Sequence, residues 1–487
     1  MRGNGALMRA LGLAFLFSLP PVRTGSQQAS VPALQAEAER LISGSDEDWS
    51  VVAWSVDRNQ PLVSINAATP RKPASNSKIF TSIWALDELG ADYRFETDLL
   101  ITGPISNGVL EGDVVLRGTG DPAFGYPPRL GYSVFEEDPM LPLRKMAARL
   151  AALGVWRVQG GVIGDATAFD SVLVGPSWPN DTGGGAAQYA PRVSGLPYQR
   201  NMIWIEAQAR PGGGRARIQL SPEVEVVPVL STVRSGGGRA LAVRQADEDT
   251  IRVKGGVSGK AISRLGVGVA HPALMTADAL RHALTEAGIQ VTSPSRLGTT
   301  PEGATLVHRH YSMSLGAMIP LLNQHSDNFF AEHIWKASAR EVLGQGSYRL
   351  GGPASALHFM HRAGVPAGEL YQFDGSGLSS YSRTSAHALV KALIYADSQP
   401  YSELFHRSLA LAADPEGTLD RLFVGTAAGG NLRAKTGYIR RVRTLSGYVH
   451  ARNGELIAFS FLYNGANTNG ARTIQEDLGV MLAEYGG

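Results

Sequence analysis

Two short stretches near the beginning of the chain carry residue types that favour β-strands. Residues 51–56 and 62–65 are rich in Val, Leu, Ile and Trp, and the residues between them include Asp, Asn and Pro. Branched and aromatic side chains suit a pleated, half-buried strand, whereas Asp, Asn and Pro suit a turn. The pattern therefore predicts an antiparallel hairpin.

The next part of the chain changes to a helical period. Ile79, Ile83 and Leu86 recur three or four positions apart, a small polar residue opens the stretch, and Gly90 follows it. Apolar residues at this spacing form one face of a helix, and Gly commonly ends one. We therefore expect a helix over residues 75–89.

Between about residues 95 and 270 the pattern consists of short alternating stretches interrupted by Gly, Pro and Asp, which is typical of β-structure. One clear helical stretch, residues 141–153, lies within it. The remainder is strongly helical until two strand-like stretches joined by turn residues, and a last helix ends the chain. The expected helices are 273–287, 314–322, 329–342, 354–361, 385–396 and 471–485, and the expected strands are 444–451 and 456–463.

The first residues have the pattern of a secretory signal peptide. Arg2 and Arg9 give a positive start, residues 10–19 are apolar, and prolines with small polar residues follow. The apolar run is shorter than the roughly 20 residues of a membrane-spanning helix, which favours cleavage over an uncleaved anchor or a buried helix. We expect residues 1–26 to be removed and the mature protein to lie in the periplasm or extracytoplasmic envelope.

The composition narrows the class of protein. A chain of 487 residues exceeds one hydrophobic core, so we expect two or three domains. Its 44% hydrophobic and 18% charged residues are typical of a globular protein, and a net charge of +2 without a Lys or Arg run gives nucleic-acid binding no electrostatic basis. The absence of Cys excludes a thiol nucleophile, a disulfide framework and a Cys-ligated metal.

Ser75 and Lys78 lie three positions apart at the start of the first expected helix, which places both side chains on one face. A serine hydroxyl needs a neighbour to take its proton, and a lysine can do so when burial or nearby cations lower its pKa. The free N–H groups of the helix end would favour an oxyanion. Taken alone, such a pair is more often an N-cap serine beside a solvated lysine.

Two tripeptides further along the chain complete a set of motifs. Ser-Asp-Asn at 326–328 lies between two expected helices, and Lys-Thr-Gly at 435–437 opens the C-terminal hairpin, where an edge strand could run beside a peptide substrate. Each tripeptide alone is common. In the order Ser-x-x-Lys, Ser-Asp-Asn, Lys-Thr-Gly they match the motifs of penicillin-binding proteins and class A β-lactamases.

The chain resembles one branch of these proteins more closely. Several segments are similar to those of the D-alanyl-D-alanine carboxypeptidase/endopeptidase family of the penicillin-binding-protein-4 type (DacB-like, peptidase family S13). They are 73–78, 326–328 with 331–332, 374–379, and 434–437 with 445–448. Gly-Thr-Gly-Asp-Pro at 118–122 resembles an insertion motif of that family. The gap of about 250 residues between the first two motifs is also similar, whereas single-domain β-lactamases have a far shorter one. The likeness covers nearly the whole mature chain.

This resemblance implies an α/β (α+β) fold of the serine β-lactamase/DD-peptidase type, with a five-stranded antiparallel sheet, helices on both faces and two inserted β-rich domains. The catalytic domain would comprise residues 27–94 and 288–487. One inserted domain would comprise residues 95–123 and 189–287, and the other residues 124–188.

The resemblance also implies a role for each motif residue. Ser75 would attack the carbonyl of the penultimate D-Ala, and Lys78 would take its proton. Ser326 and Lys435 would relay a proton to the leaving D-Ala.

Further positions would bind the substrate. Asn328 would orient its amide, and Lys435 with Thr436 would hold the terminal carboxylate by charge-assisted hydrogen bonds. Backbone N–H groups of Ser75 and Tyr438, next to Gly437, would form the oxyanion hole.

Tyr438 departs from the family, which commonly has Thr or Ser at this position. A phenol is bulkier, so substrate preference or penicillin affinity could differ without loss of activity. Arg440, Arg441 and Arg443 follow closely and could favour acidic stem peptides, but a solvated strand or loop face is at least as good an interpretation.

No cofactor or metal is expected. His308 with His310, and His358 with His361, have no carboxylate at a recognisable ligand spacing, and no H-E-x-x-H motif occurs. A G-x-S-x-G elbow is also absent around Ser376, which weakens an α/β-hydrolase interpretation.

The leading hypothesis is thus a serine D-Ala-D-Ala carboxypeptidase, with or without endopeptidase action. Its partners would be peptidoglycan stem peptides and, as covalent inhibitors, β-lactam antibiotics. A β-lactamase or esterase on the same scaffold and a catalytically silent peptidoglycan-binding protein are the alternatives. At most peripheral membrane association is expected, and a homodimer is an open alternative.

Overall fold

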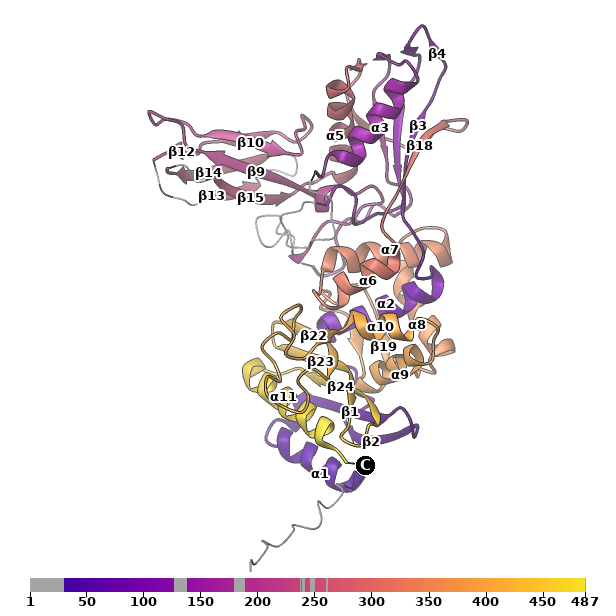
Figure 1. Ribbon diagram of the computed structural model, residues 1–487, viewed down its shortest axis with the longest axis vertical. Helices are drawn as coiled ribbons and strands as arrows, with labels where there is room; N and C mark the ends of the chain where they lie inside the picture. The colour runs from indigo at the N-terminus through magenta and orange to yellow at the C-terminus, as the bar shows by residue number, and fades with distance from the viewer. Residues whose placement is uncertain are drawn as a thin grey trace, which may run out of the picture.

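The computed structural model describes residues 30–126, 138–178, 189–236, 238, 241–245, 250–259 and 262–486. Figure 1 shows an elongated molecule in which the first and last described segments lie in one part and the middle of the chain forms another. We call residues 30–94 and 312–486 the core unit, and the described residues between 95 and 311 the inserted region. The expected signal peptide, residues 1–26, lies outside the described residues, which begin at residue 30.

The core unit is built on one antiparallel sheet in the order β2-β1-β24-β23-β22-β21. The predicted hairpin and the two predicted C-terminal strands are confirmed. The sheet has six strands rather than the expected five, because a two-residue strand pairs with the outer end of β22. The strands are β1 (Trp49–Ser55), β2 (Gln60–Ile65), β21 (Ala410–Leu411), β22 (Arg433–Ile439), β23 (Val442–His450) and β24 (Leu456–Tyr463).

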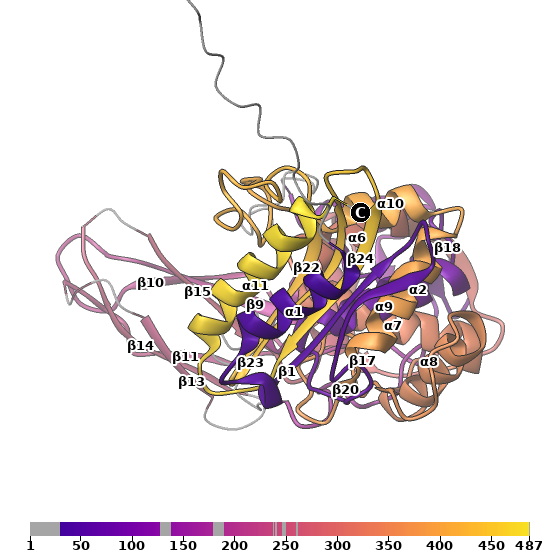
Figure 2. The ribbon, with the colours of Figure 1, turned by 90° about the horizontal axis from the view of Figure 1, so that it is seen from below.

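Both faces of this sheet are buried, and alternate residues of a strand pack on opposite sides. In β1, Val51 and Ala53 belong to the hydrophobic cluster under α1 and α11, whereas Val52 belongs to the cluster around α2. Figure 2 shows α1 and α11 side by side on one face. The helices are α1 (Val31–Ile42), α2 (Ser77–Glu88), α6 (Leu315–Asn323), α7 (Asn328–Leu343), α8 (Tyr348–Arg362), α9 (Ala386–Asp397), α10 (Ser402–Ser408) and α11 (Thr468–Glu484).

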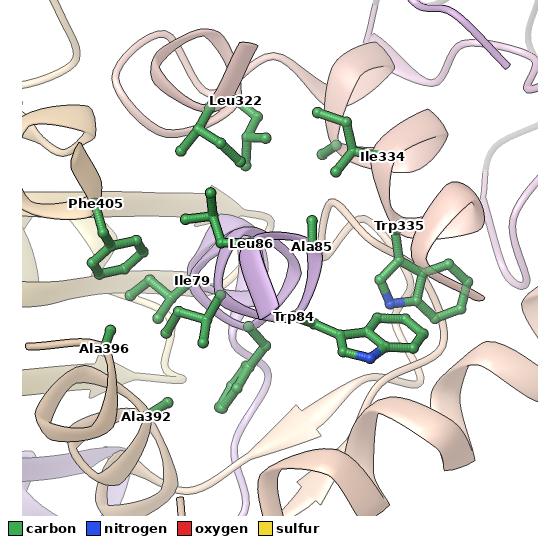
Figure 3. Packing of buried hydrophobic residues seen from close by; sticks show 14 of the residues in the cluster. Ile79, Trp84, Ala85, Leu86, Leu322, Ile334, Trp335, Ala392, Ala396 and Phe405 are labelled. Atoms are coloured by element: carbon green, nitrogen blue, oxygen red, sulfur yellow. The ribbon is translucent and has the colours of Figure 1, made fainter. Parts of the chain in front are cut away.

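Helix α2 lies at the centre of the larger cluster, where Figure 3 shows it surrounded by α6, α7, α9 and α10. Trp84 packs edge-on against Trp335 of α7, with ring centroids 6.1 Å apart. Leu86 and Ile79 face Leu322 and Phe405 (Figure 3). A helix packed on all sides has little freedom to shift, so the residues at its beginning have fixed positions.

The inserted region adjoining the core unit contains two sheets, in the orders β17-β8-β6-β3-β18 and β16-β7-β5-β4, packed with two helices. The helices are α3 (Leu141–Ala152) and α5 (Pro272–Glu286). The strands are β3 (Glu96–Ile101), β4 (Ile105–Ser106), β5 (Val109–Leu110), β6 (Val114–Gly118), β7 (Arg157–Val158), β8 (Val162–Asp165), β16 (Gln290–Val291), β17 (Arg296–Leu297) and β18 (Thr305–Tyr311).

A second group of strands projects from this part as a separate arm (Figure 1). It forms a three-stranded sheet, β10-β9-β15, and a second sheet in which β14 pairs with β11, β12 and β13. The strands are β9 (Met202–Gln208), β10 (Arg217–Ser221), β11 (Val229–Ser231), β12 (Arg234–Ser235), β13 (Leu241–Gln245), β14 (Ile251–Val257) and β15 (Ile262–Gly268).

The strand pairing divides the inserted region differently from the expected boundaries. The described residues among 124–188 do not form a separate unit, because β8 pairs in parallel with β6 and β7 pairs with β5. Strand β18 lies beyond residue 288, yet it pairs with β3 rather than joining the core sheet. The separate arm is formed instead by the described residues between 202 and 268. These pairings join segments far apart in sequence, which a hydrophobic pattern does not record.

The predicted helices are confirmed within a few residues, with one marked exception. Helix α8 begins at Tyr348, before Pro353, although the pattern predicts a start at 354. Helices α1 and α10 and the small β19–β20 pair, Leu370–Tyr371 with Arg383–Thr384, are additional. Within the described residues, no helix combines the length and apolar character needed to cross a membrane.

Candidate active site

The chain turns sharply just before α2. Residues Ala74–Asn76 form a single 3₁₀ turn, and Ala74 has a φ of +47°, which is uncommon for a residue with a side chain. Gly377 packs against this turn so closely that a Cβ on it would lie 1.8 Å from the carbonyl oxygen of Ala74. Strained backbone of this kind persists only where surrounding contacts hold it. Ser75, half-buried, is therefore held at the mouth of the helix.

Lys78 lies one turn further on, fully buried, as the predicted pair requires. Its Nζ is 3.0 Å from Ser75 Oγ, 2.7 Å from Asn328 Oδ1 and 3.0 Å from the carbonyl oxygen of Ser376. When the amine donates its hydrogens to Asn328 and to the Ser376 carbonyl, its third position points at Ser75 Oγ. The solvated-lysine alternative is therefore wrong for this residue.

Burial lowers the pKa of Lys78 to about 8, although Glu332, Asp374 and Asp327 act in the opposite direction. Removing an ammonium from water disfavours its charged form, whereas nearby carboxylates favour it. A substantial fraction of the amine is therefore neutral near pH 8. Only the neutral form can accept the Ser75 proton.

The Ser-Asp-Asn motif lies at the start of α7, where Asp327 caps the helix by accepting from Phe329 N at 2.8 Å. The other carboxylate oxygen of Asp327 accepts from Arg200 Nη1 of the inserted region at 2.6 Å. Asn328 reaches Lys78 through its oxygen and donates its amide nitrogen to the carbonyl of Tyr189 at 2.6 Å. The cap and the ion pair thus fix the position of Asn328.

Ser326 precedes this cap with a φ of +60° and is partly exposed. No hydrogen bond joins its hydroxyl to another described residue. The structure therefore places Ser326 two residues from Asn328 without connecting it directly to Lys78, Ser75 or Lys435.

Lys435 lies on β22, and its side chain is fully buried. Asn76 donates to the carbonyl oxygen of Lys435 at 2.6 Å, which links the strand to the residue next to Ser75. Burial and the positive charge of Lys78 together hold the pKa of Lys435 well below its usual value. Its Nζ donates to the carbonyl oxygen of Thr436 at 2.9 Å.

The adjacent strand residues approach the nucleophile closely. A Cβ on Gly437 would lie 2.0 Å from Thr444 Oγ1 and 3.1 Å from the backbone nitrogen of Ser75. Thr444 in turn donates to the carbonyl of Pro73 at 2.8 Å. Only glycine permits this contact, so the strand runs directly beside the Ser75 N–H. The Thr436 hydroxyl donates to that of Thr418 at 2.9 Å.

Tyr438 points outward, with 58% of its surface exposed, and the Arg443 guanidinium lies 5.1 Å from its ring centroid. Burial and the nearby Tyr438 both raise the pKa of Tyr189. Arg440 and Arg441 are exposed. The bulk of the phenol therefore lies outside the buried cluster, and the strand backbone beneath it is undisturbed.

Two buried carboxylates, Glu332 and Asp374, lie near the lysines, and the sequence predicts no role for either. Glu332 accepts from the N–H groups of Gly375 and Ser376 at 3.1 and 2.6 Å. Asp374 accepts from Trp178 Nε1 at 2.7 Å and Ser379 N at 2.6 Å. The one signal available in the sequence is the Asp-Gly-Ser-Gly loop, because its glycines permit close approach.

The inserted region contributes three residues to the surroundings of the site: Trp178, Tyr189 and Arg200. Their spacing from the motifs carries no periodic signal, so the sequence does not predict them. Some polar groups of the expected catalytic domain therefore have their hydrogen-bond partners in the inserted region. The inserted region supplies some of the contacts that hold the site.

Comparison with known proteins extends this picture. A model described as the D-Ala-D-Ala carboxypeptidase 3 (S13) family matches residues 30–485. The D-alanyl-D-alanine carboxypeptidase of Actinomadura sp. (strain R39) is 30% identical over 100% of this chain and 92% of that protein. The D-alanyl-D-alanine carboxypeptidase DacB of Haemophilus influenzae is 24% identical over 88% of each. The crystal structure of penicillin binding protein 4 (dacB) from Haemophilus influenzae has a TM-score of 0.76 at 23% identity, covering 92% of this chain and 99% of that one.

Proposed function

Because the chain belongs to the D-Ala-D-Ala carboxypeptidase 3 (S13) family, we propose that it acts through an acyl-enzyme on Ser75, with Lys78 as general base. The chain is a serine-type D-Ala-D-Ala carboxypeptidase. The observation that carries the residue roles is the 3.0 Å contact between Lys78 Nζ and Ser75 Oγ, made by a fully buried amine.

In the first step Ser75 Oγ attacks the carbonyl carbon of the penultimate D-Ala while neutral Lys78 takes the hydroxyl proton. The backbone N–H groups of Ser75 and Tyr438 stabilise the oxyanion. Support comes from the approach of Gly437 to the Ser75 nitrogen, which brings strand β22 alongside the carbonyl to be attacked. Water then hydrolyses the acyl-enzyme and restores Ser75.

Lys435 and Thr436 bind the terminal carboxylate of the substrate. Before binding, burial beside Lys78 favours the neutral form of Lys435. An incoming carboxylate raises the pKa of a buried amine, so binding and protonation of Lys435 support each other. Ser326, at the turn before Asn328, passes a proton toward the leaving D-Ala, and Asn328 orients the substrate amide.

The substrate is the C-terminal D-Ala-D-Ala of peptidoglycan stem peptides, and penicillin acylates the same serine. The support is the family, together with the name of the Haemophilus influenzae relative, penicillin binding protein 4. This substrate requires an extracytoplasmic location, so we also propose export by the N-terminal segment. The exposed Arg440 and Arg441 beside β22 suit an acidic stem peptide.

The test measures D-Ala release from a stem pentapeptide by the wild type, Ser75→Ala and Ser402→Ala. Ser402 begins α10 and has no place in the proposed mechanism, so its variant serves as the matched serine control. We expect release by the wild type and Ser402→Ala, and a loss of at least about 1,000-fold in Ser75→Ala. Unchanged release by Ser75→Ala, or none by the wild type, would reject the assignment. Rapid turnover of nitrocefin without D-Ala release would favour a β-lactamase.

A further inference from the structure

Glu332 is a fully buried carboxylate that the proposed mechanism does not use. It lies on α7, one turn after Asn328, and it contacts no Arg or Lys at ion-pair distance among the described residues. A carboxylate placed in this way is costly unless it has a function or is fully hydrogen-bonded. The contacts of Glu332 therefore indicate what this buried carboxylate does.

The two oxygens of the Glu332 carboxylate accept hydrogen bonds from two successive backbone N–H groups. Oε2 accepts from Gly375 N at 3.1 Å, and Oε1 accepts from Ser376 N at 2.6 Å. Two bonds to successive N–H groups fix the orientation of that segment, including the direction of its next carbonyl. The Ser376 carbonyl oxygen is the one that accepts from Lys78 Nζ at 3.0 Å.

The same loop is held from the other side by α2. Thr81 Oγ1 donates to the Gly375 carbonyl oxygen at 2.6 Å. Gly375 has no room for a side chain, because a Cβ would lie 2.5 Å from Trp335 Cβ and 2.6 Å from the Ala331 carbonyl oxygen. The loop is thus clamped between α7 and α2, the two helices that carry Asn328 and Lys78.

We propose that Glu332 is a positioning residue of the acylation step, which holds the Ser376 carbonyl against Lys78 and so directs the lysine's free electron pair at Ser75. This inference rests on the proposed function. Four charged groups surround Lys78: Glu332, Asp374 and Asp327, and the like charge of Lys435. Removing one carboxylate from this set lowers the pKa of Lys78, because less negative charge nearby disfavours its ammonium form.

The experiment is stopped-flow acylation by nitrocefin, which separates the acylation rate constant from the dissociation constant of the non-covalent complex. Glu332→Gln keeps the shape but presents an amide N–H₂ to one of the two backbone donors. We expect the rate constant to fall about 10- to 100-fold, with the dissociation constant within about threefold of wild type. The midpoint of the rate against pH should also move downward by about half a unit.

Two matched variants separate positioning from general damage. Glu341→Gln changes an exposed carboxylate on the same helix, and Glu369→Gln changes a buried one whose partners are Ser385 and His387. Both should acylate as the wild type does. Equal loss in Glu369→Gln, or a wild-type rate and pH profile in Glu332→Gln, overturns the inference.

If Glu332→Gln does not fold, Thr81→Val loosens the same loop from α2. It should lower the acylation rate constant by about 3- to 10-fold, and an unchanged constant overturns the inference. The wild type serves as the reference for the proposed function. If it forms no adduct, that function fails, whereas a normal wild type with a normal Glu332→Gln removes only this inference.

Discussion

Asp98 of the inserted region and Glu332 of the core unit are both buried carboxylates, but their pKa values shift in opposite directions. In the inserted region, burial would raise the pKa of Asp98, yet hydrogen bonds from Arg309 at 2.7 Å and Arg117 at 2.8 Å lower it. In the core unit, burial and the adjacent Asp374 raise the pKa of Glu332 to about 8. One carboxylate is neutralised by cations, and the other is not.

The difference indicates that the buried charge of Asp98 stabilises the fold, whereas the buried groups near Ser75 take part in the chemistry. Arg117 and Arg309, which bond to Asp98, compensate its desolvation and stabilise the pairing of β3 with β6 and β18. Near Ser75, Lys78 and Glu332 are buried without an arginine partner, and the pKa of each is about 8. Perturbed pKa values of this kind cluster at functional sites. The four predictions below test this contrast.

Removing the buried amine should have the largest effect. Lys78→Met keeps the volume of the side chain but leaves Ser75 without a base, so acylation by a labelled penicillin should slow by about 1,000-fold or more. The melting temperature should not fall, because a desolvated amine is removed from a buried site. Acylation within tenfold of wild type would show that another group accepts the proton.

Removing the charge of the arginine-paired carboxylate should lower stability and leave the acylation rate unchanged. Asp98→Asn should lower the free energy of unfolding by about 2 kcal/mol, measured by urea denaturation, with an unchanged acylation rate. The lowered pKa of Asp98 adds stability above its unfolded value of about 3.9, and this contribution is lost as pH falls through the folded value. The variant should therefore lose less stability than the wild type on acidification. A slower acylation in this variant would contradict the separation of the two regions.

The acylation rate should depend on pH in the direction set by Lys78. Because only the neutral amine accepts a proton, the rate should rise through pH 8, by about tenfold between pH 7 and pH 9. Penicillin acylation followed across this range is the measurement. A rate that falls over the same interval would mean that the ammonium form is the active one.

The smallest effect should come from a surface pair in the inserted region. Arg264 is 44% exposed and bonds to Glu206 at 2.8 Å across β9 and β15. Arg264→Ala should change the free energy of unfolding by less than about 1 kcal/mol and leave acylation unaltered. A loss above this bound would show that surface pairs here contribute more than exposed pairs normally do.

The sequence predicts the elements of the core unit well, because their signals are local. The period of Ile79, Ile83 and Leu86 marks α2, and the strands of both hairpins follow their residue types. The motif residues Ser75, Lys78 and Asn328 do meet in space. For Ser326 and Lys435 the roles come from the family resemblance, and they stay predictions.

The rest depends on pairings that leave no local signal. Strand β8 joins β6 across a long separation, so the hydrophobic pattern does not show how the inserted region divides. Trp178 and Arg200 reach Asp374 and Asp327 only after the inserted region folds back onto the core unit. The chemistry of a site is thus easier to predict from sequence than the contacts that support it.

The most direct test of the account is the position of the penicillin adduct. Purified protein would be incubated with benzylpenicillin, digested, and analysed by mass spectrometry, alongside Ser75→Ala. The account predicts one adduct, on the peptide that contains Ser75, and none in the variant. An adduct on any other residue, or an adduct that survives in Ser75→Ala, would contradict it.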